Sequence, residues 1–60
     1  MLKKDIKKLK NKVIDVELVD IIAESRDVES VDCLGLKGNN LEWIVNLTNE
    51  TTVRLYTRGE

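Results

Sequence analysis

The densest run of charge in the sequence is residues 3–12, KKDIKKLKNK, and its chemistry is that of an anion-binding surface. Six lysines against Asp5 give the first twelve residues a side-chain charge of +5. We call these lysines the lysine patch: Lys3, Lys4, Lys7, Lys8, Lys10 and Lys12. A row of ammonium groups can neutralise phosphates, and binding of that kind weakens steeply as salt rises. The lysine patch is therefore a candidate electrostatic surface.

Residues 13–32 carry the opposite sign, because seven carboxylates stand there against Arg26 and give a charge of −6. The whole chain has a formal charge of −1 and a pI near 5.4. Three interpretations of the lysine patch stay open: a solvated helix face, a surface against the acidic segment of this chain or another copy, and a phosphate-binding surface. We favour the solvated face, because the clustered carboxylates would repel a long polyanion.

Tyr56 stands between Arg54 and Arg58 in a segment with strand character, and Ile44 is its expected cross-strand neighbour. Tyrosine and arginine beside an aliphatic side chain are the residue types enriched at interface hot spots. An aromatic ring on a strand can also stack on a nucleic-acid base. The alternative is an ordinary, half-exposed sheet face. Ile44, Arg54, Tyr56 and Arg58 are therefore a candidate interaction face.

Catalytic and metal chemistry lack their usual residues in this sequence. The chain has no histidine and one cysteine, so a zinc site built from these types and a Ser–His or Cys–His nucleophile are excluded. Cys33 lies in an apolar stretch beside Asp32, which disfavours a thiolate, and we expect it to be inert packing. The three glycines are not spaced as a phosphate-binding loop. We predict that the protein is not an enzyme and binds no metal or cofactor.

The elements that must position these residues follow from hydrophobic spacing. Leu2, Ile6 and Leu9 recur at helical spacing and predict a helix over about residues 2–11. In residues 13–23 apolar and acidic residues alternate, which favours a strand, although a helical period also fits. Further strands are expected near 28–36, 41–47 and 53–58. Gly35 marks a bulge or a close approach of another backbone.

The turns set which strand residues face one another. Gly38-Asn39 suits a two-residue type II′ turn, which would place Leu36 opposite Leu41 and Leu34 opposite Trp43. The next loop should have an odd number of residues, because only that parity sets Leu47 opposite Val53 on one apolar face. The fold class is thus α+β: residues 1–60 as a single small domain, with an N-terminal helix followed by a four-stranded antiparallel meander in a strongly curved sheet or small open barrel.

Size argues for self-association. A 60-residue chain buries only about 60% of its unfolded surface, and small domains usually need reinforcement. The predicted strand at 13–23 is apolar on both sides and would need a second cover, such as another subunit. We therefore expect a homo-oligomer. No apolar run suggests a signal peptide or a membrane span, and a lone cysteine fits a reducing compartment, so we expect a cytoplasmic protein without membrane contact.

These observations rank two classes of function. The first is a small binding protein, a regulator or inhibitor that acts by protein–protein contact, whose partners are itself and an unidentified protein. The second is a nucleic-acid-binding module that uses the lysine patch together with Arg54, Tyr56 and Arg58. The missing catalytic residues and the sorting of charges by sign favour the first.

Overall fold

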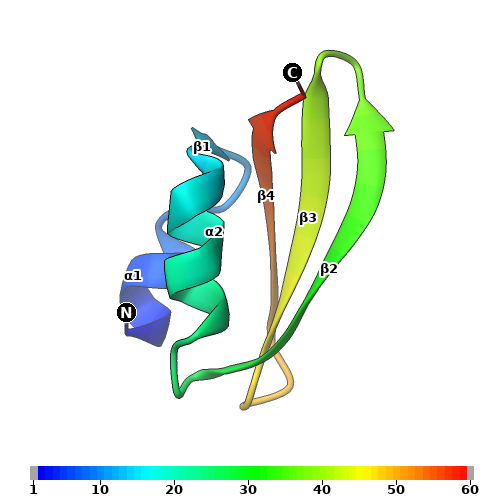
Figure 1. The fold of residues 1–60 in the computed structure, drawn as a ribbon. Helices are drawn as coiled ribbons and strands as arrows, with labels where there is room; N and C mark the ends of the chain where they lie inside the picture. The colour runs from blue at the N-terminus through cyan, green and yellow to red at the C-terminus, as the bar shows by residue number, and fades with distance from the viewer. Residues whose placement is uncertain (1, 60) are drawn as a thin grey trace.

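Two short helices cover one face of a four-stranded sheet (Figure 1). The structure, a computed structural model, describes residues 2–59. In chain order its elements are α1 (Lys3–Lys7), β1 (Val13–Ile14), α2 (Val16–Ala23), β2 (Val28–Lys37), β3 (Asn40–Leu47) and β4 (Thr52–Arg58). The strands lie in the order β1-β4-β3-β2, with β1 parallel to β4 and the other pairs antiparallel. The α+β class is confirmed. The all-antiparallel meander and the strongly curved or barrel-like sheet were wrong, because the sheet is mixed and is not closed or strongly curled.

The strand predicted over residues 13–23 was wrong beyond Ile14. Only Val13–Ile14 is extended, and Val16–Ala23 is the helix α2. Val19 and Ile22 are both buried in the core. Residues three apart share one face of a helix but lie on opposite faces of a strand, so only the helix buries both against the sheet. The argument that a doubly apolar strand needs a second subunit therefore no longer applies.

The first helix is shorter than the predicted span of about 2–11. Beyond Lys7 the chain continues in three-residue turns, in which the backbone N–H of Leu9 bonds to the carbonyl of Ile6 at 3.0 Å and that of Lys12 to the carbonyl of Leu9 at 3.0 Å. Asn11 ends these turns in the left-handed region, with φ 62°. Ile6 is fully buried and Leu9 half-buried, so the apolar stripe does face the sheet.

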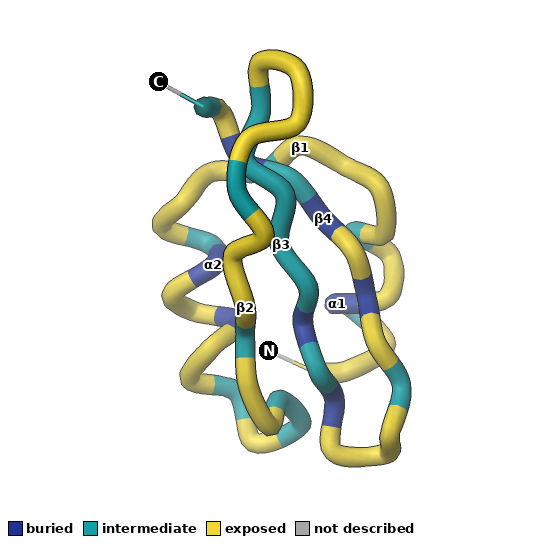
Figure 2. The backbone as a smooth tube through the Cα atoms, turned by 90° about the vertical axis from the view of Figure 1, so that its right-hand side faces the viewer, coloured by how far each residue is buried: buried dark blue, intermediate teal, exposed yellow. Residues whose placement is uncertain are grey.

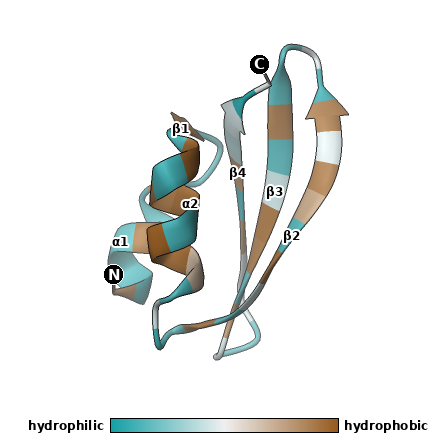
Figure 3. Ribbon diagram, viewed as in Figure 1, coloured by the Kyte–Doolittle hydropathy of each residue, from teal (hydrophilic) through white to brown (hydrophobic). Residues whose placement is uncertain are grey.

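The core lies between the two helices and the inner face of β3 and β4. Its buried side chains are Ile6, Val19, Ile22, Val45, Leu47, Val53 and Leu55. In Figure 3 hydrophilic and hydrophobic residues alternate along the first half of β3, as expected for a strand with one covered face. The helices therefore cover one side of the sheet and leave the other side open.

The hairpin between β2 and β3 confirms one predicted pair and corrects the next. Leu36 lies opposite Leu41, joined through Gly38, whose φ is 64°. A bulge follows between Cys33 and Gly35, where φ at Gly35 is 105°, so Cys33 and not Leu34 lies opposite Trp43. Leu34 and Leu36 are 56% and 69% exposed, so their predicted place on the dry face was wrong. Cys33 is exposed as well, which contradicts its expected role in packing.

The loop between β3 and β4 has the odd length that parity predicts. It consists of residues 48–50, because the backbone N–H of Leu47 donates to the carbonyl of Thr51 at 2.8 Å. Val53 consequently lies opposite Val45, which is two residues from the predicted partner Leu47. Apolar residues still face one another on the covered side, since a shift of two residues preserves the face.

Candidate interaction face

The side of the sheet away from the helices forms a continuous surface that we call the open face. Because side chains alternate across a strand, the residues between the buried ones of β3 and β4 point to this side. In Figure 2 the three long strands lie in front of α1, so this side of the sheet faces the viewer. By register the open face consists of Val13, Ser30, Asp32, Gly35, Lys37, Asn40, Glu42, Ile44, Asn46, Thr52, Arg54, Tyr56 and Arg58.

All four residues of the candidate interaction face lie together on the open face. Ile44 is directly opposite Arg54, and Tyr56 lies two residues further along β4, opposite Glu42. Ile44 and Tyr56 are therefore diagonal neighbours, within reach of an aromatic side chain. Both are half-buried, whereas Arg54 and Arg58 are exposed. The arrangement is an aliphatic–aromatic centre with cations beside it.

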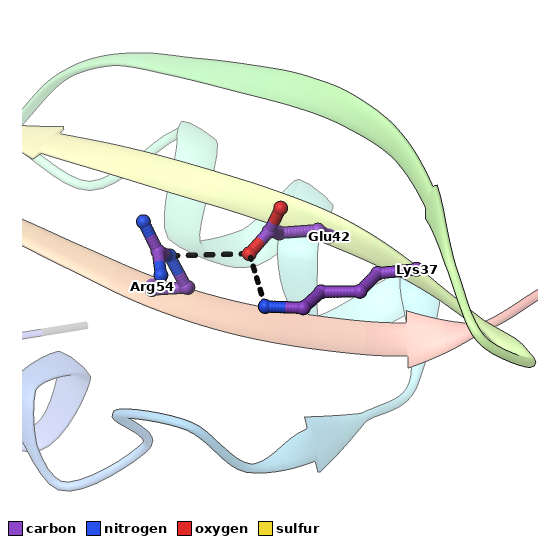
Figure 4. Close-up of polar contacts among 3 residues, drawn as sticks. All are labelled: Lys37, Glu42 and Arg54. Atoms are coloured by element: carbon purple, nitrogen blue, oxygen red, sulfur yellow. Dashed lines mark ion pairs between the residues drawn. The ribbon is translucent and has the colours of Figure 1, made fainter.

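Glu42 is a charged residue of the open face that is not among the four residues of the candidate interaction face. Its Oε2 lies 3.2 Å from Nε of Arg54 and 3.8 Å from Nζ of Lys37 (Figure 4). The Glu42 side chain is 15% exposed, against 50% for Arg54 and 62% for Lys37. The signal was available in the sequence, because side chains alternate along β3 and put Glu42 on the same side as Ile44. One carboxylate between two cations holds the guanidinium of Arg54 near the centre of the face.

Away from Glu42, towards the β3–β4 loop, the open face carries neutral and acidic side chains that are hydrogen-bonded to one another. Nδ2 of Asn46 donates to Oγ of Ser30 and to Oδ2 of Asp32, both at 3.0 Å. The open face thus has a half-buried centre at Ile44 and Tyr56 with polar groups around it. Protein interfaces have the same anatomy, an apolar core within a polar rim.

The lysine patch lies on α1 and the turns that follow it, and all six side chains are exposed. Within residues 2–59 the ion pairs are the two of Glu42, so no lysine of the patch has a carboxylate within ion-pair distance. This agrees with the solvated-face interpretation. The acidic segment meets α1 instead through a backbone contact, in which the N–H of Lys3 donates to Oδ2 of Asp27 at 3.0 Å.

The end of the lysine patch is joined to the strand that carries Tyr56. The backbone N–H of Asn11 donates to the carbonyl of Arg54 at 2.7 Å, and that of Tyr56 donates to the carbonyl of Lys12 at 2.9 Å. The last lysine of the patch and the cations of β4 therefore come from adjacent segments, although they are distant in sequence.

Among the residues that the structure describes, no three His, Cys, Asp or Glu side chains are grouped as metal ligands. Neither helix in this part of the chain has the length and apolar character to cross a membrane. The chain matches no protein-family model, no curated protein and no solved structure. Function must therefore be argued from the open face itself.

Proposed function

We propose that the chain is a small cytoplasmic binding protein, a regulator or an inhibitor, that contacts another protein through its open face. The observation that supports this most is the half-buried pair Ile44 and Tyr56 with Arg54 and Arg58 around it. Tyrosine and arginine carry a large share of the binding energy at protein interfaces. A partner would offer an apolar side chain to Tyr56 and carboxylates to the two arginines.

The position of these residues in the sheet supports the same proposal. β3 and β4 are the two inner strands, each paired on both sides. The backbone beneath these side chains is already ordered, so binding does not have to order it. The ion pair with Glu42 restricts Arg54 in addition. A preorganised face of this kind suits a protein whose only activity is binding.

We also propose that the protein is a homo-oligomer. The chain has 60 residues, and among residues 2–59 six large apolar side chains are more than half exposed: Leu2, Val13, Val16, Ile21, Leu34 and Leu36. Exposed apolar surface on a small domain is favourable to association, since burying it removes it from water.

The binding proposal is tested with three forms of the chain, each tethered to a solid support. Wild type, Tyr56→Ala and Thr52→Ala are compared for capture of the same partner, which is identified by mass spectrometry and then titrated in purified form. Thr52 is the matched control, because it is exposed on the same face of the same strand. We expect Tyr56→Ala to weaken binding by about tenfold or more and Thr52→Ala to leave it unchanged. Equal affinity of all three forms, or no partner at all, overturns the proposal.

A second candidate function is nucleic-acid binding, and the backbone contacts of Asn11 and Lys12 with β4 favour it. They bring the end of the lysine patch beside Arg54 and Tyr56, so phosphates and a stacked base could be bound by adjacent segments. Labelled single- and double-stranded oligonucleotides should then bind the purified protein, with an affinity that falls steeply between about 50 and 200 mM salt. If no oligonucleotide binds at the lower salt, nucleic-acid binding is excluded as a function.

A further inference from the structure

The two helices form a layer whose outer surface is uncovered. They lie beside each other over the sheet, α1 on the side of β4 and α2 on the side of β2 (Figure 1 and Figure 2). Ile6 of α1 and Val19 and Ile22 of α2 are buried against the sheet. With 3.6 residues per turn, the residues on the opposite side of each helix point away from the sheet. We call this outer surface the helix face.

The helix face is basic on one side and acidic on the other. The side chains that point outward are exposed and of one sign on each helix and its C-cap: Lys4, Lys7 and Lys8 on α1, and Glu17, Asp20 and Glu24 on α2. Among residues 2–59 both ion pairs belong to Glu42, on the other side of the sheet. The two sets of charges on the helix face are therefore not paired with each other within one chain.

The acidic side of the helix face does not stabilise α2 itself. Asp20 and Glu24 stand in its last turn and at its C-cap, and the last turn holds no basic residue. The helix dipole disfavours negative charge at that end. Ile21, which lies between them in sequence, is 54% exposed. Both features become favourable if a cationic surface covers this side of α2, because lysine stems can cover an apolar side chain while their ammonium groups meet carboxylates.

The charge pattern of the helix face is complementary to itself. A two-fold axis that runs between the helices, parallel to α2, places α1 of each copy over α2 of the other. The lysines of each copy then meet the carboxylates of its partner, and the contact is made twice, as in an isologous interface. An axis that runs across α2 would instead set like charges over like charges, which is unfavourable. The surface that fits the helix face is thus the helix face of a second copy.

We propose that two copies of this chain associate through their helix faces, with α1 of each copy against α2 of the other. The open faces then lie on the two outer sides of the dimer and stay accessible to another protein. This inference rests on the homo-oligomer proposed above and names its surface. It does not depend on what the open face binds.

Complementary charge reversal tests the contact. Sedimentation equilibrium of the wild-type chain should give twice the monomer mass of 6.9 kDa at sufficient concentration, and the dimer should weaken in about 1 M salt. The variant Lys4→Glu/Lys7→Glu makes both helices acidic, and Asp20→Lys/Glu24→Lys makes both more basic. We expect the dimer dissociation constant of each variant alone to rise tenfold or more. An equimolar mixture sets opposite charges across both contacts, so it should form a heterodimer within about threefold of the wild-type dissociation constant.

Recovery on mixing can come only from a contact between copies, and a control separates it from attraction by net charge. Lys37→Glu/Arg58→Glu has the same net charge as the acidic variant, but its changes lie on the open face. It should dimerise within about threefold of wild type and should not restore a dimer when mixed with Asp20→Lys/Glu24→Lys. Circular dichroism checks that each variant is folded, which we expect because the exchanged side chains are exposed.

The outcomes separate this inference from the other proposals. A wild-type dimer that neither reversal weakens, or a mixture that does not recover, overturns the helix-face contact and leaves the homo-oligomer to another surface. A wild-type chain that is monomeric at all concentrations overturns both and leaves the helix face to solvent or to a different protein. Tyr56→Ala should not alter the mass, because Tyr56 lies on the open face, so failure of the binding proposal is recognised independently.

Discussion

The indole Nε1 of Trp43 on β3 donates a hydrogen bond to Oγ1 of Thr57 on β4 at a distance of 2.9 Å. Thr57 is 1% exposed and is the buried polar side chain of the region 2–59. Trp43 itself is half-buried and packs against the core. The bond satisfies the one polar atom of the indole, so the large ring can lie over the covered face of the sheet without leaving an unpaired donor.

Replacing Thr57 by valine should therefore destabilise the protein. The change preserves the shape of the side chain but removes the acceptor of the Trp43 N–H, and we expect a loss of about 1–2 kcal/mol in the free energy of unfolding. Urea unfolding followed by fluorescence of Trp43, the single tryptophan, measures it. Thr52→Val is the matched control on the exposed side of the same strand, and it should change stability by less than about 0.5 kcal/mol. Equal effects of the two changes would contradict a role for the bond.

The contact between Asp27 and Lys3 predicts a second effect on stability. Oδ2 of Asp27 accepts the backbone N–H at the start of α1, where no side chain of the helix itself caps the end. Asp27→Ala should lower the free energy of unfolding by about 0.5–2 kcal/mol, as loss of a cap does. Asp27→Asn retains an oxygen acceptor and should lose less than half as much. Thermal unfolding followed by circular dichroism compares the three forms. If the asparagine variant loses as much free energy of unfolding as the alanine variant, the capping role is contradicted.

The side of the sheet on which each residue of β3 and β4 lies was predictable from the sequence. Ile44, Arg54 and Tyr56 share a face because side chains alternate along a strand and an odd loop preserves that alternation. Glu42 follows from the same register and could have been included. Gly35 also signalled the bulge, but a glycine alone does not say whether Leu34 leaves the pairing or another backbone approaches.

The segment Val13–Ala23 could not be predicted from local pattern, because its apolar residues fit both a strand and a helix. What decides between them is distant in sequence: Val13 and Ile14 pair with Tyr56 and Thr57 at the end of the chain. That pairing uses the first two residues as a strand and leaves Val19 and Ile22 to cover the core. Tertiary contacts of this kind override local preference.

Glu42→Gln should have a small effect that depends on salt. The carboxylate pairs with Arg54 and Lys37, whose side chains are half or more exposed, so we expect a loss of about 0.5–1 kcal/mol at low salt. The difference from wild type should shrink in about 1 M NaCl, where the Debye length falls to about 3 Å. Glu50→Gln, in an exposed loop, is the control and should show neither effect. A loss above about 2 kcal/mol, or one that salt does not alter, would mean that Glu42 acts through something other than ion pairing.

Glu50→Gly should stabilise the protein. Glu50 ends the β3–β4 loop with φ 65°, in the left-handed region that is unfavourable for residues with a Cβ and open to glycine. Part of the gain is offset because glycine adds freedom to the unfolded chain, so we expect a net increase of about 0.5–1 kcal/mol in the free energy of unfolding. Glu50→Ala is the matched control: it removes the carboxylate but retains the Cβ, and it should bring no gain. If alanine stabilises as much as glycine, the benefit comes from removing a charge and the backbone conformation of the loop is not strained.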